Sequence, residues 1–116
     1  MKQLRRLSVA TLQKSAKVKQ TNGANLTTYA DVRTYKVVAH EITDSVYASI
    51  YGANIRNMLR LSTPLMALES FLKTKNNESS DNLSLYFILI GDKRFKITAV
   101  YNNWVDIEFY ETDRTV

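Results

Sequence analysis

The stretch "LSLYFILIGDKRFKITAV" (residues 83–100) decides the fold that we expect for this chain. Two apolar runs meet at Gly91-Asp92, which suits a two-residue type I′ or II′ turn because glycine tolerates positive φ. After the turn, apolar side chains alternate with polar ones, which is the period of a strand with one buried face. The stretch therefore predicts an antiparallel β-hairpin.

Strand signals extend to both sides of this hairpin. A turn at Asn102-Asn103 leads into a further alternating segment, so the C-terminal part is predicted to be a three-stranded meander. Near the N-terminus, residues 6–18 alternate loosely and residues 27–39 are rich in β-branched and aromatic side chains. Asn22-Gly23 between them is a strong turn signal, and the two segments are predicted to form another hairpin.

One segment has the pattern of a helix, at about residues 64–75. Thr63 is a candidate N-cap, and Pro64 suits the first helical position because its missing N–H costs nothing there. Glu69 and Lys73 are spaced for a favourable i,i+4 pair, and the apolar stripe contains Leu65, Leu68 and Leu72. The predicted fold is mainly β: a small antiparallel barrel or strongly curved sheet with one short helix, in a single domain of residues 1–116.

The composition excludes several classes of protein. The 116 residues contain no cysteine and a single histidine, His40, so disulfides, thiolate metal sites and multi-histidine metal sites are excluded. The apolar runs are too short for a membrane-spanning helix, which needs roughly 18 residues. The first residues lack the apolar stretch of a signal peptide, so we expect a soluble protein made inside the cell.

No catalytic constellation stands out, and we expect a protein that is not an enzyme and binds no cofactor or metal. His40-Glu41 lacks the second histidine of a zinc hydrolase motif, and no Gly-x-Ser-x-Gly elbow is present. The acids Asp106, Glu108 and Glu111 follow strand periodicity. We therefore interpret them as a solvated strand face rather than as paired catalytic carboxylates.

Charge is distributed unevenly along the chain. Residues 1–36 hold eight lysines and arginines against one acid, whereas residues 37–116 hold eight bases against ten acids. A solvated strand face with a basic terminus would explain this, and so would an electropositive surface facing a polyanion or an acidic protein. Because only two tyrosines fall among these bases, the pattern does not favour a stacking platform for single-stranded nucleic acid.

The stretch "DSVYASIYGANIRNML" (residues 44–59) has the two-residue period of a strand until Tyr51-Gly52 interrupts it. Together with "TNGANLTTYADVRTYKVVAHEITDSVYASIYGA" and "LYFILIGDKRFKITAVYNNWVDIEFYE", it resembles the head-closure proteins (stoppers, or head–tail joining proteins) of long-tailed bacteriophages. The resemblance covers about residues 6–111. It rests on Glu41-Ile42-Thr43-Asp44, on Ser49-Ile50-Tyr51-Gly52-Ala53 and on the Gly91-x-x-Arg-Phe-Lys-Ile hairpin.

The resemblance implies a structural protein of the phage neck, located in the virion at the head–tail interface and made in the host cytoplasm. Such proteins form a ring, usually of twelve subunits, below the portal and adaptor proteins. The ring closes the DNA channel after packaging and gives the tail completion or tail terminator protein a docking surface. The family's β-barrel carries a long projecting loop, which would be residues 44–60 here. Its interface or channel residues would be Tyr47, Ile50, Tyr51, Gly52, Ile55 and Arg56.

The basic N-terminal part could face the adaptor or the packaged DNA, which would be contacted without sequence specificity. The residues concerned are Arg5, Arg6, Lys14, Lys17 and Lys19. Strong phosphate binding would slow DNA ejection, so we favour protein contacts for most of them. The alternatives are a small basic β-barrel that binds nucleic acid nonspecifically, and another neck ring protein such as a tail terminator.

Overall fold

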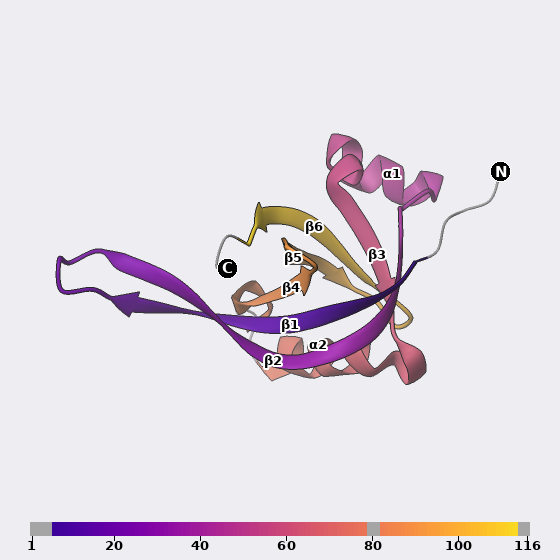
Figure 1. Ribbon diagram of the computed structural model, residues 1–116. Helices are drawn as coiled ribbons and strands as arrows, with labels where there is room; N and C mark the ends of the chain where they lie inside the picture. The colour runs from indigo at the N-terminus through magenta and orange to yellow at the C-terminus, as the bar shows by residue number, and fades with distance from the viewer. Residues whose placement is uncertain (1–5, 79–81, 114–116) are drawn as a thin grey trace.

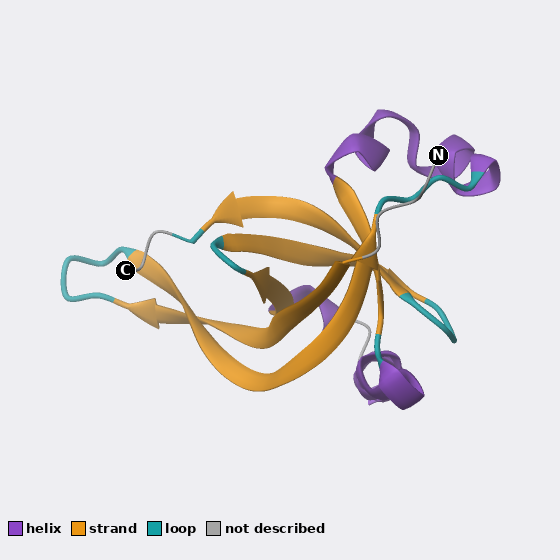
Figure 2. Cartoon of the chain, turned by 45° about the vertical axis from the view of Figure 1, so that its right-hand side comes forward, coloured by secondary structure: helices purple, strands orange, loops and turns teal. Residues whose placement is uncertain are grey.

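Six antiparallel strands close into a small barrel in the computed structural model, which describes residues 6–78 and 82–113 (Figure 1). Both α-helices of this described part lie outside the ring of strands (Figure 2). The predicted mainly β antiparallel fold is confirmed. The strands are β1 (Arg6–Lys19), β2 (Asn25–His40), β3 (Met58–Ser62), β4 (Tyr86–Ile90), β5 (Lys93–Val100) and β6 (Val105–Thr112). The helices are α1 (Ser45–Tyr51) and α2 (Ala67–Glu78), with 3₁₀ turns η1 (Gly52–Asn57), η2 (Pro64–Met66) and η3 (Asn82–Leu85).

The ring has the strand order β1-β2-β3-β6-β5-β4, and it closes where β4 pairs with β1. Local turn chemistry builds its hairpins as the sequence predicts. Ile90 pairs with Lys93 around the Gly91-Asp92 turn, where Gly91 has a φ of +62°. At the other hairpin, Gly23 has a φ of +87° in the loop between β1 and β2. Such φ values are strained for residues with a Cβ, so these turns depend on glycine.

The barrel interior is apolar and is filled from all six strands and from α2. On β2 the buried residues alternate, as expected for a strand with one face inward. The C-terminal meander (β4–β6) and the N-terminal hairpin (β1–β2) both contribute side chains from each of their strands. The core cluster contains Ala10, Leu12, Tyr35, Val37, Ala39, Leu61, Leu68, Leu72, Tyr86, Ile88, Phe95, Val105 and Ile107.

The predicted helix at about 64–75 starts later than expected: Leu65 and Met66 have positive φ (57° and 54°) in η2, and α2 spans Ala67–Glu78. Leu68 and Leu72 of the predicted apolar stripe are buried, but Leu65 is exposed, which corrects that part of the prediction. Thr63 stands at the N-cap position of η2 but makes no side-chain capping bond there; its Oγ1 instead accepts a hydrogen bond from the Leu68 N–H of α2 at 3.0 Å. The same hydroxyl donates to Glu69, which is buried, and Lys73 donates to Asn102. These two contacts replace the predicted Glu69–Lys73 pair.

The segment 44–60 differs from the extended projecting loop that we expected. It leaves the ring of strands, but as α1 and η1, and its last residues belong to β3 (Figure 1). Asp44 caps α1, since its Oδ1 accepts from the Val46 N–H at 2.8 Å. The spacing of Tyr47 and Tyr51 misled the prediction. Residues four apart lie on one face of a strand, but they also lie on one face of a helix. The prediction that this chain has a single helix was therefore wrong.

Candidate interaction surfaces

The β1–β2 hairpin extends well beyond the ring of strands. The two strands pair along their whole length, from Arg6 opposite Ala39 to Lys19 opposite Asn25. Their other neighbours cover only part of that length: β4 pairs with residues 11–14 of β1, and β3 pairs with residues 38–40 of β2. The outer part, which we call the hairpin arm (residues 16–28), therefore projects from the barrel (Figure 1).

The hairpin arm has two chemically different faces. Successive side chains of a strand point to opposite faces, and directly paired residues share a face. Lys17 and Lys19 lie on one face, and both are exposed. On the other face Val18 pairs with Leu26, and these side chains remain 49% and 48% exposed. The hairpin arm is thus a two-stranded ribbon with a basic face and an uncovered apolar face.

The predicted basic residues are only partly gathered on this arm. Lys14 lies at its base, exposed, with its Nζ 5.9 Å from the centre of the Tyr86 ring. Arg6 begins β1, but its side chain is not described, and Arg5 lies outside the described residues. Lys17 and Lys19 are therefore the two predicted basic residues that the structure places on the hairpin arm.

A buried ion pair joins β3 to β6 beside α1. Arg60 on β3 donates from Nε to Asp106 Oδ1 at 2.8 Å and from Nη2 to Oδ2 at 3.0 Å. Asp106, on β6, is fully buried. Its hydrogen bonds with Arg60 raise the pKa of that guanidinium, although burial acts in the opposite direction. This two-point contact fixes the orientation of both side chains as well as their charge.

The tyrosines of α1 complete this site. Tyr51 donates its hydroxyl proton to Asp106 Oδ2 at 2.7 Å, and burial, followed by this bond and one with Tyr101, raises its pKa. Because that proton is used, the 3.3 Å contact between the Tyr51 and Tyr101 hydroxyls requires Tyr101 to be the donor. The Arg60 Cζ lies 4.6 Å from the Tyr47 ring centre and 4.5 Å from that of Trp104. We call these six residues the Arg60 site.

The opposite face of α1 is uncovered. Val46 and Ile50, four residues apart, are 63% and 65% exposed, whereas Tyr47 and Tyr51 are half-buried. Gly52 ends the helix with a φ of +62°, and its N–H donates to the Ala48 carbonyl. The helix therefore has two apolar sides: one packs against the barrel, and the other is exposed to solvent.

The predicted loop residues consequently divide into two groups. Tyr47 and Tyr51 bind within their own chain, which corrects the expectation that they are reserved for neighbouring subunits. Ile50 and Arg56 are exposed, and Ile55 is half-buried in η1.

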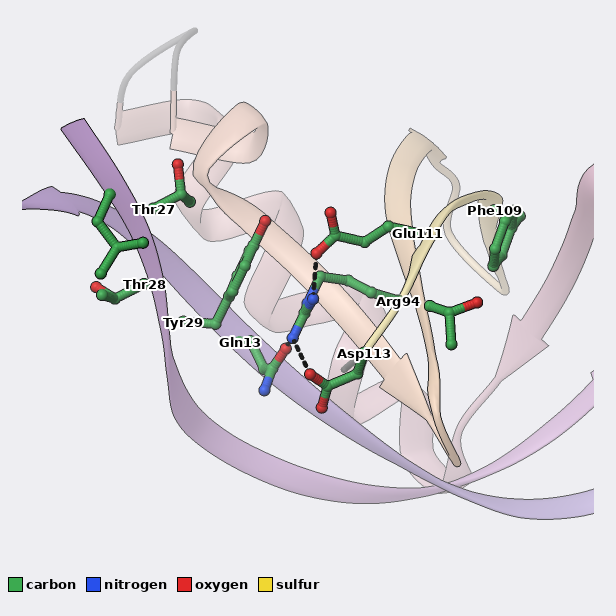
Figure 3. Close-up of a pocket in the computed structure, with 10 residues that line it drawn as sticks. Gln13, Thr27, Thr28, Tyr29, Arg94, Phe109, Glu111 and Asp113 are labelled. Atoms are coloured by element: carbon green, nitrogen blue, oxygen red, sulfur yellow. Dashed lines mark hydrogen bonds and ion pairs between the residues drawn. The ribbon is translucent and has the colours of Figure 1, made fainter. Parts of the chain in front are cut away.

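A second buried arginine lies where the hairpin arm meets the barrel. Arg94 on β5 donates from Nε to Gln13 Oε1 at 3.1 Å, and it forms ion pairs with Glu111 and with Asp113, the latter at 3.4 Å (Figure 3). Its Cζ lies 3.7 Å from the centre of the Tyr29 ring. Burial, followed by the Glu111 carboxylate, raises the pKa of Tyr29. We call these five residues the Arg94 site.

The Arg94 site borders an open hollow of about 1030 Å³, also lined by Leu26 of the hairpin arm and Phe109 of β6. An arginine at the wall of a hollow could bind an anion. Here, however, Glu111 and Asp113 already oppose its charge (Figure 3). The arrangement therefore favours a fastening role for Arg94, which connects β1, β2, β5 and β6, over anion binding.

Sequence reasoning missed both arginine sites. The interpretation of Asp106 as part of a solvated strand face was wrong, because Val105, Asp106 and Ile107 are all buried. Glu108 is half-buried and lies 3.8 Å from Lys96, and Glu111 faces Arg94. One signal was available in the sequence: Asp106 lies among apolar residues, next to Val105 and Ile107 and close to Trp104. A carboxylate in such a position is expected to be buried and therefore to need a charged or hydrogen-bonding partner.

Neither the family models nor the curated proteins provide a match for this chain.

Within the described residues, no group of three or more histidine, cysteine, aspartate or glutamate side chains could hold a metal ion. No helix of the described part is long and apolar enough to cross a membrane. His40 lies at the end of β2, with its Nδ1 2.9 Å from the Glu41 carbonyl oxygen.

Proposed function

We propose that this chain is a structural, non-enzymatic subunit of a phage neck. It forms a ring below the portal and adaptor proteins, closes the DNA channel after packaging, and offers a docking surface to the tail completion or tail terminator protein. The ring contains twelve subunits, and packaged DNA passes through it without sequence-specific contacts. The setting is the head–tail interface of the virion, after synthesis in the host cytoplasm.

One observation carries this proposal beyond the sequence resemblance. A small barrel holds two appendages, the hairpin arm and α1, each fastened at its base by a buried arginine site. Both appendages present uncovered apolar side chains to solvent. Fixed positions and uncovered apolar groups are properties of surfaces that bind other proteins, because little ordering entropy is lost on contact.

The acidic side chains and Tyr51 of the two arginine sites also support a structural role. Asp106, Glu111 and Asp113 each face an arginine, and Tyr51 donates to Asp106. Side chains engaged in this way hold elements together. A catalytic acid or base instead needs an accessible proton acceptor or donor beside a substrate position.

The test is deletion of this gene from a phage that carries it, followed by electron microscopy of the lysate. We expect heads that have packaged DNA and then lost it, together with unattached tails, and rescue by the wild-type gene from a plasmid. Complete, DNA-filled and tailed particles in the deletion lysate would refute the proposal. Tail terminators act on the tail, so stable DNA-filled heads with tails of irregular length would indicate that alternative instead.

The exposed Lys17 and Lys19 favour one further candidate, a protein that binds nucleic acid nonspecifically. Titration of duplex DNA at increasing salt separates the two functions. Binding through phosphates would weaken steeply with salt, and the slope would become smaller in a Lys17→Ala/Lys19→Ala variant. We expect only weak DNA binding, because the neck role requires the DNA to move through the ring.

A further inference from the structure

The turn at the far end of the hairpin arm carries the dipeptide Asn22-Gly23 (Figure 1). Both residues are exposed, and no other asparagine of the 116-residue sequence precedes a glycine. A Cβ built on Gly23 would meet no atom within 4 Å, so the space around this residue is open. The turn therefore places an accessible side-chain amide next to a backbone N–H that no side chain shields.

The Asn22 side chain is folded back over the peptide that follows it. Its Oδ1 accepts a hydrogen bond from the Ala24 N–H at 3.0 Å, which is an Asx turn. This hydrogen bond closes a ring of atoms that contains Cγ of Asn22 and the nitrogen of Gly23, and it polarises the Cγ carbonyl. An electrophilic carbon and a backbone nitrogen are thereby held near each other.

One hydrogen bond acts against a reaction between these two atoms. The Gly23 N–H donates to the Gln20 carbonyl at 3.0 Å, so the nitrogen has to leave this partner before it loses its proton. The turn lies beyond the residues of β1 and β2 that pair with a third strand. Backbone hydrogen bonds in such peripheral turns open at low free energy, so this bond slows attack by the nitrogen without preventing it.

We infer that Asn22 is a modification site at which the chain converts its own asparagine into aspartate and isoaspartate. The Gly23 nitrogen gives up its proton and bonds to Cγ of Asn22. The bond between Cγ and the side-chain nitrogen then breaks, and ammonia leaves with that proton. The product is a cyclic imide, a succinimide, in the main chain.

Water completes the reaction by opening the imide. Its hydroxyl adds to one ring carbonyl carbon, the bond from that carbon to the Gly23 nitrogen breaks, and the proton returns to the nitrogen. Opening at Cγ restores the ordinary backbone and leaves aspartate. Opening at the main-chain carbonyl carbon leaves a backbone that runs through Cγ, which is isoaspartate. In total, one water is consumed and one ammonia is released.

Either product changes the hairpin arm. A carboxyl group of ordinary pKa, about 3.9, is ionised at neutral pH. Because residues 16–28 contain Lys17 and Lys19 and no acid, an anion appears where the arm carried only positive charge. Isoaspartate also lengthens the main chain inside the turn, where the Gln20 N–H donates to the Ala24 carbonyl at 2.8 Å. The modification therefore alters both the charge and the pairing at the end of this appendage.

The reaction requires only the turn and water, so this inference goes beyond the proposed neck function and does not rest on it. It is tested on the purified, full-length chain, whereas the neck function is read from lysates of a deletion phage. Failure of one therefore leaves the other standing.

Peptide mass spectrometry after incubation at neutral pH and physiological temperature provides the test. Trypsin cleavage after Lys19 and Arg33 releases residues 20–33, which also contain Asn25. Asn25 is exposed too, but it precedes Leu26, so it is a control within the same peptide. We expect several-fold more conversion at residue 22 than at residue 25. No conversion at Asn22, or no more than at Asn25, would overturn the inference.

The isomers formed at residue 22 test the cyclic route. Direct hydrolysis of the side-chain amide gives aspartate alone, whereas the imide opens at either carbonyl. We therefore expect isoaspartate together with aspartate, separated by chromatography of the same peptide. Aspartate without isoaspartate would refute attack by the Gly23 nitrogen.

Asn22→Gln is the matched variant, because it keeps the amide but moves its carbon one methylene further from the Gly23 nitrogen. Isoelectric focusing should show an acidic form that accumulates with time in the wild type and accumulates several-fold more slowly in the variant. Thermal melting checks that the variant folds, as expected for a change at an exposed turn. Equal accumulation in both chains would assign the charge change to another residue and contradict the role of Asn22.

Discussion

The Arg60 site and the Arg94 site use the same groups in different surroundings. Each places a guanidinium against aromatic rings and carboxylate oxygens, and each fastens an appendage to the barrel. Asp106 is fully buried, whereas the Glu111 side chain is 41% exposed. Water screens an exposed ion pair and stabilises a charge that loses its partner. Removing the carboxylate should therefore cost more stability at the buried Arg60 site than at the partly exposed Arg94 site.

Loss of Asp106 should have the largest effect. Asp106→Ala leaves Arg60 buried without its carboxylate, and breaking a buried pair in this way typically costs about 3–5 kcal/mol. The free energy of unfolding from denaturant titration measures it. Arg60→Met/Asp106→Leu is the matched control and should lose less, because no buried charge is left unpaired; a greater loss in the control would contradict this explanation.

Tyr51→Phe should have the next largest effect. The change removes the hydroxyl that donates to Asp106 at 2.7 Å while keeping the ring and its contact with Tyr47. Hydrogen bonds to charged groups contribute about 1.5–3 kcal/mol, so we expect a loss in that range by denaturant titration. Tyr47→Phe is the control, because its contacts with Arg60 and Trp104 are made by the ring. An equal loss in both variants would assign the effect to general packing of α1.

Tyr51 should also make the folded state sensitive to alkali. Burial raises its pKa above the ordinary tyrosine value of about 10, so the folded chain retains a proton that the unfolded chain releases. The stabilising contribution is complete below about pH 10 and is lost as pH rises through the folded pKa. Above pH 10, the free energy of unfolding should therefore fall less steeply with pH in Tyr51→Phe than in the wild type. It should still fall in the variant, because the pKa values of Tyr29 and Tyr35 are also raised. Identical slopes would contradict the assignment.

A smaller effect is expected at the Arg94 site. Glu111→Ala removes a partly exposed carboxylate, while Asp113 and Gln13 remain beside Arg94. Solvent screening limits such a pair to about 1 kcal/mol or less, and added salt should reduce the difference further. Measurement alongside Asp106→Ala at low and high salt gives the comparison directly. A loss as large as that of Asp106→Ala would show that exposure does not distinguish the two sites.

The smallest effect should come from the exposed face of α1. Val46→Ser and Ile50→Ser remove side chains that touch mainly solvent, so stability should change by no more than about 0.5 kcal/mol. Phe95→Ser, in the core, is the contrasting variant and should unfold the chain by opening a cavity and burying a hydroxyl. Thermal melting distinguishes them. If Ile50→Ser melts like Phe95→Ser, this face of α1 is structural.

Local rules predicted the hairpins because everything they require is adjacent in sequence. Gly91 supplies its own positive φ, and alternation in β5 places Phe95 inward whatever lies opposite. The same rules failed at residues 44–60, where two tyrosines four residues apart fit one face of a strand and one face of a helix equally. The contacts of Tyr47 and Tyr51 with Trp104 and Asp106 favour the helix, and these residues come from the far end of the chain.

The sequence by itself determined the antiparallel β architecture, its turns, the α2 region and the uneven distribution of charge. Only the tertiary structure decided which charges are buried and what they hold together. Arg60 and Asp106 are 46 residues apart, and Gln13 and Arg94 are 81 apart. A charge can be buried only where the fold brings it an opposite charge and hydrogen bonds, because desolvation otherwise outweighs any gain. That condition depends on closure of the barrel, which no local pattern encodes.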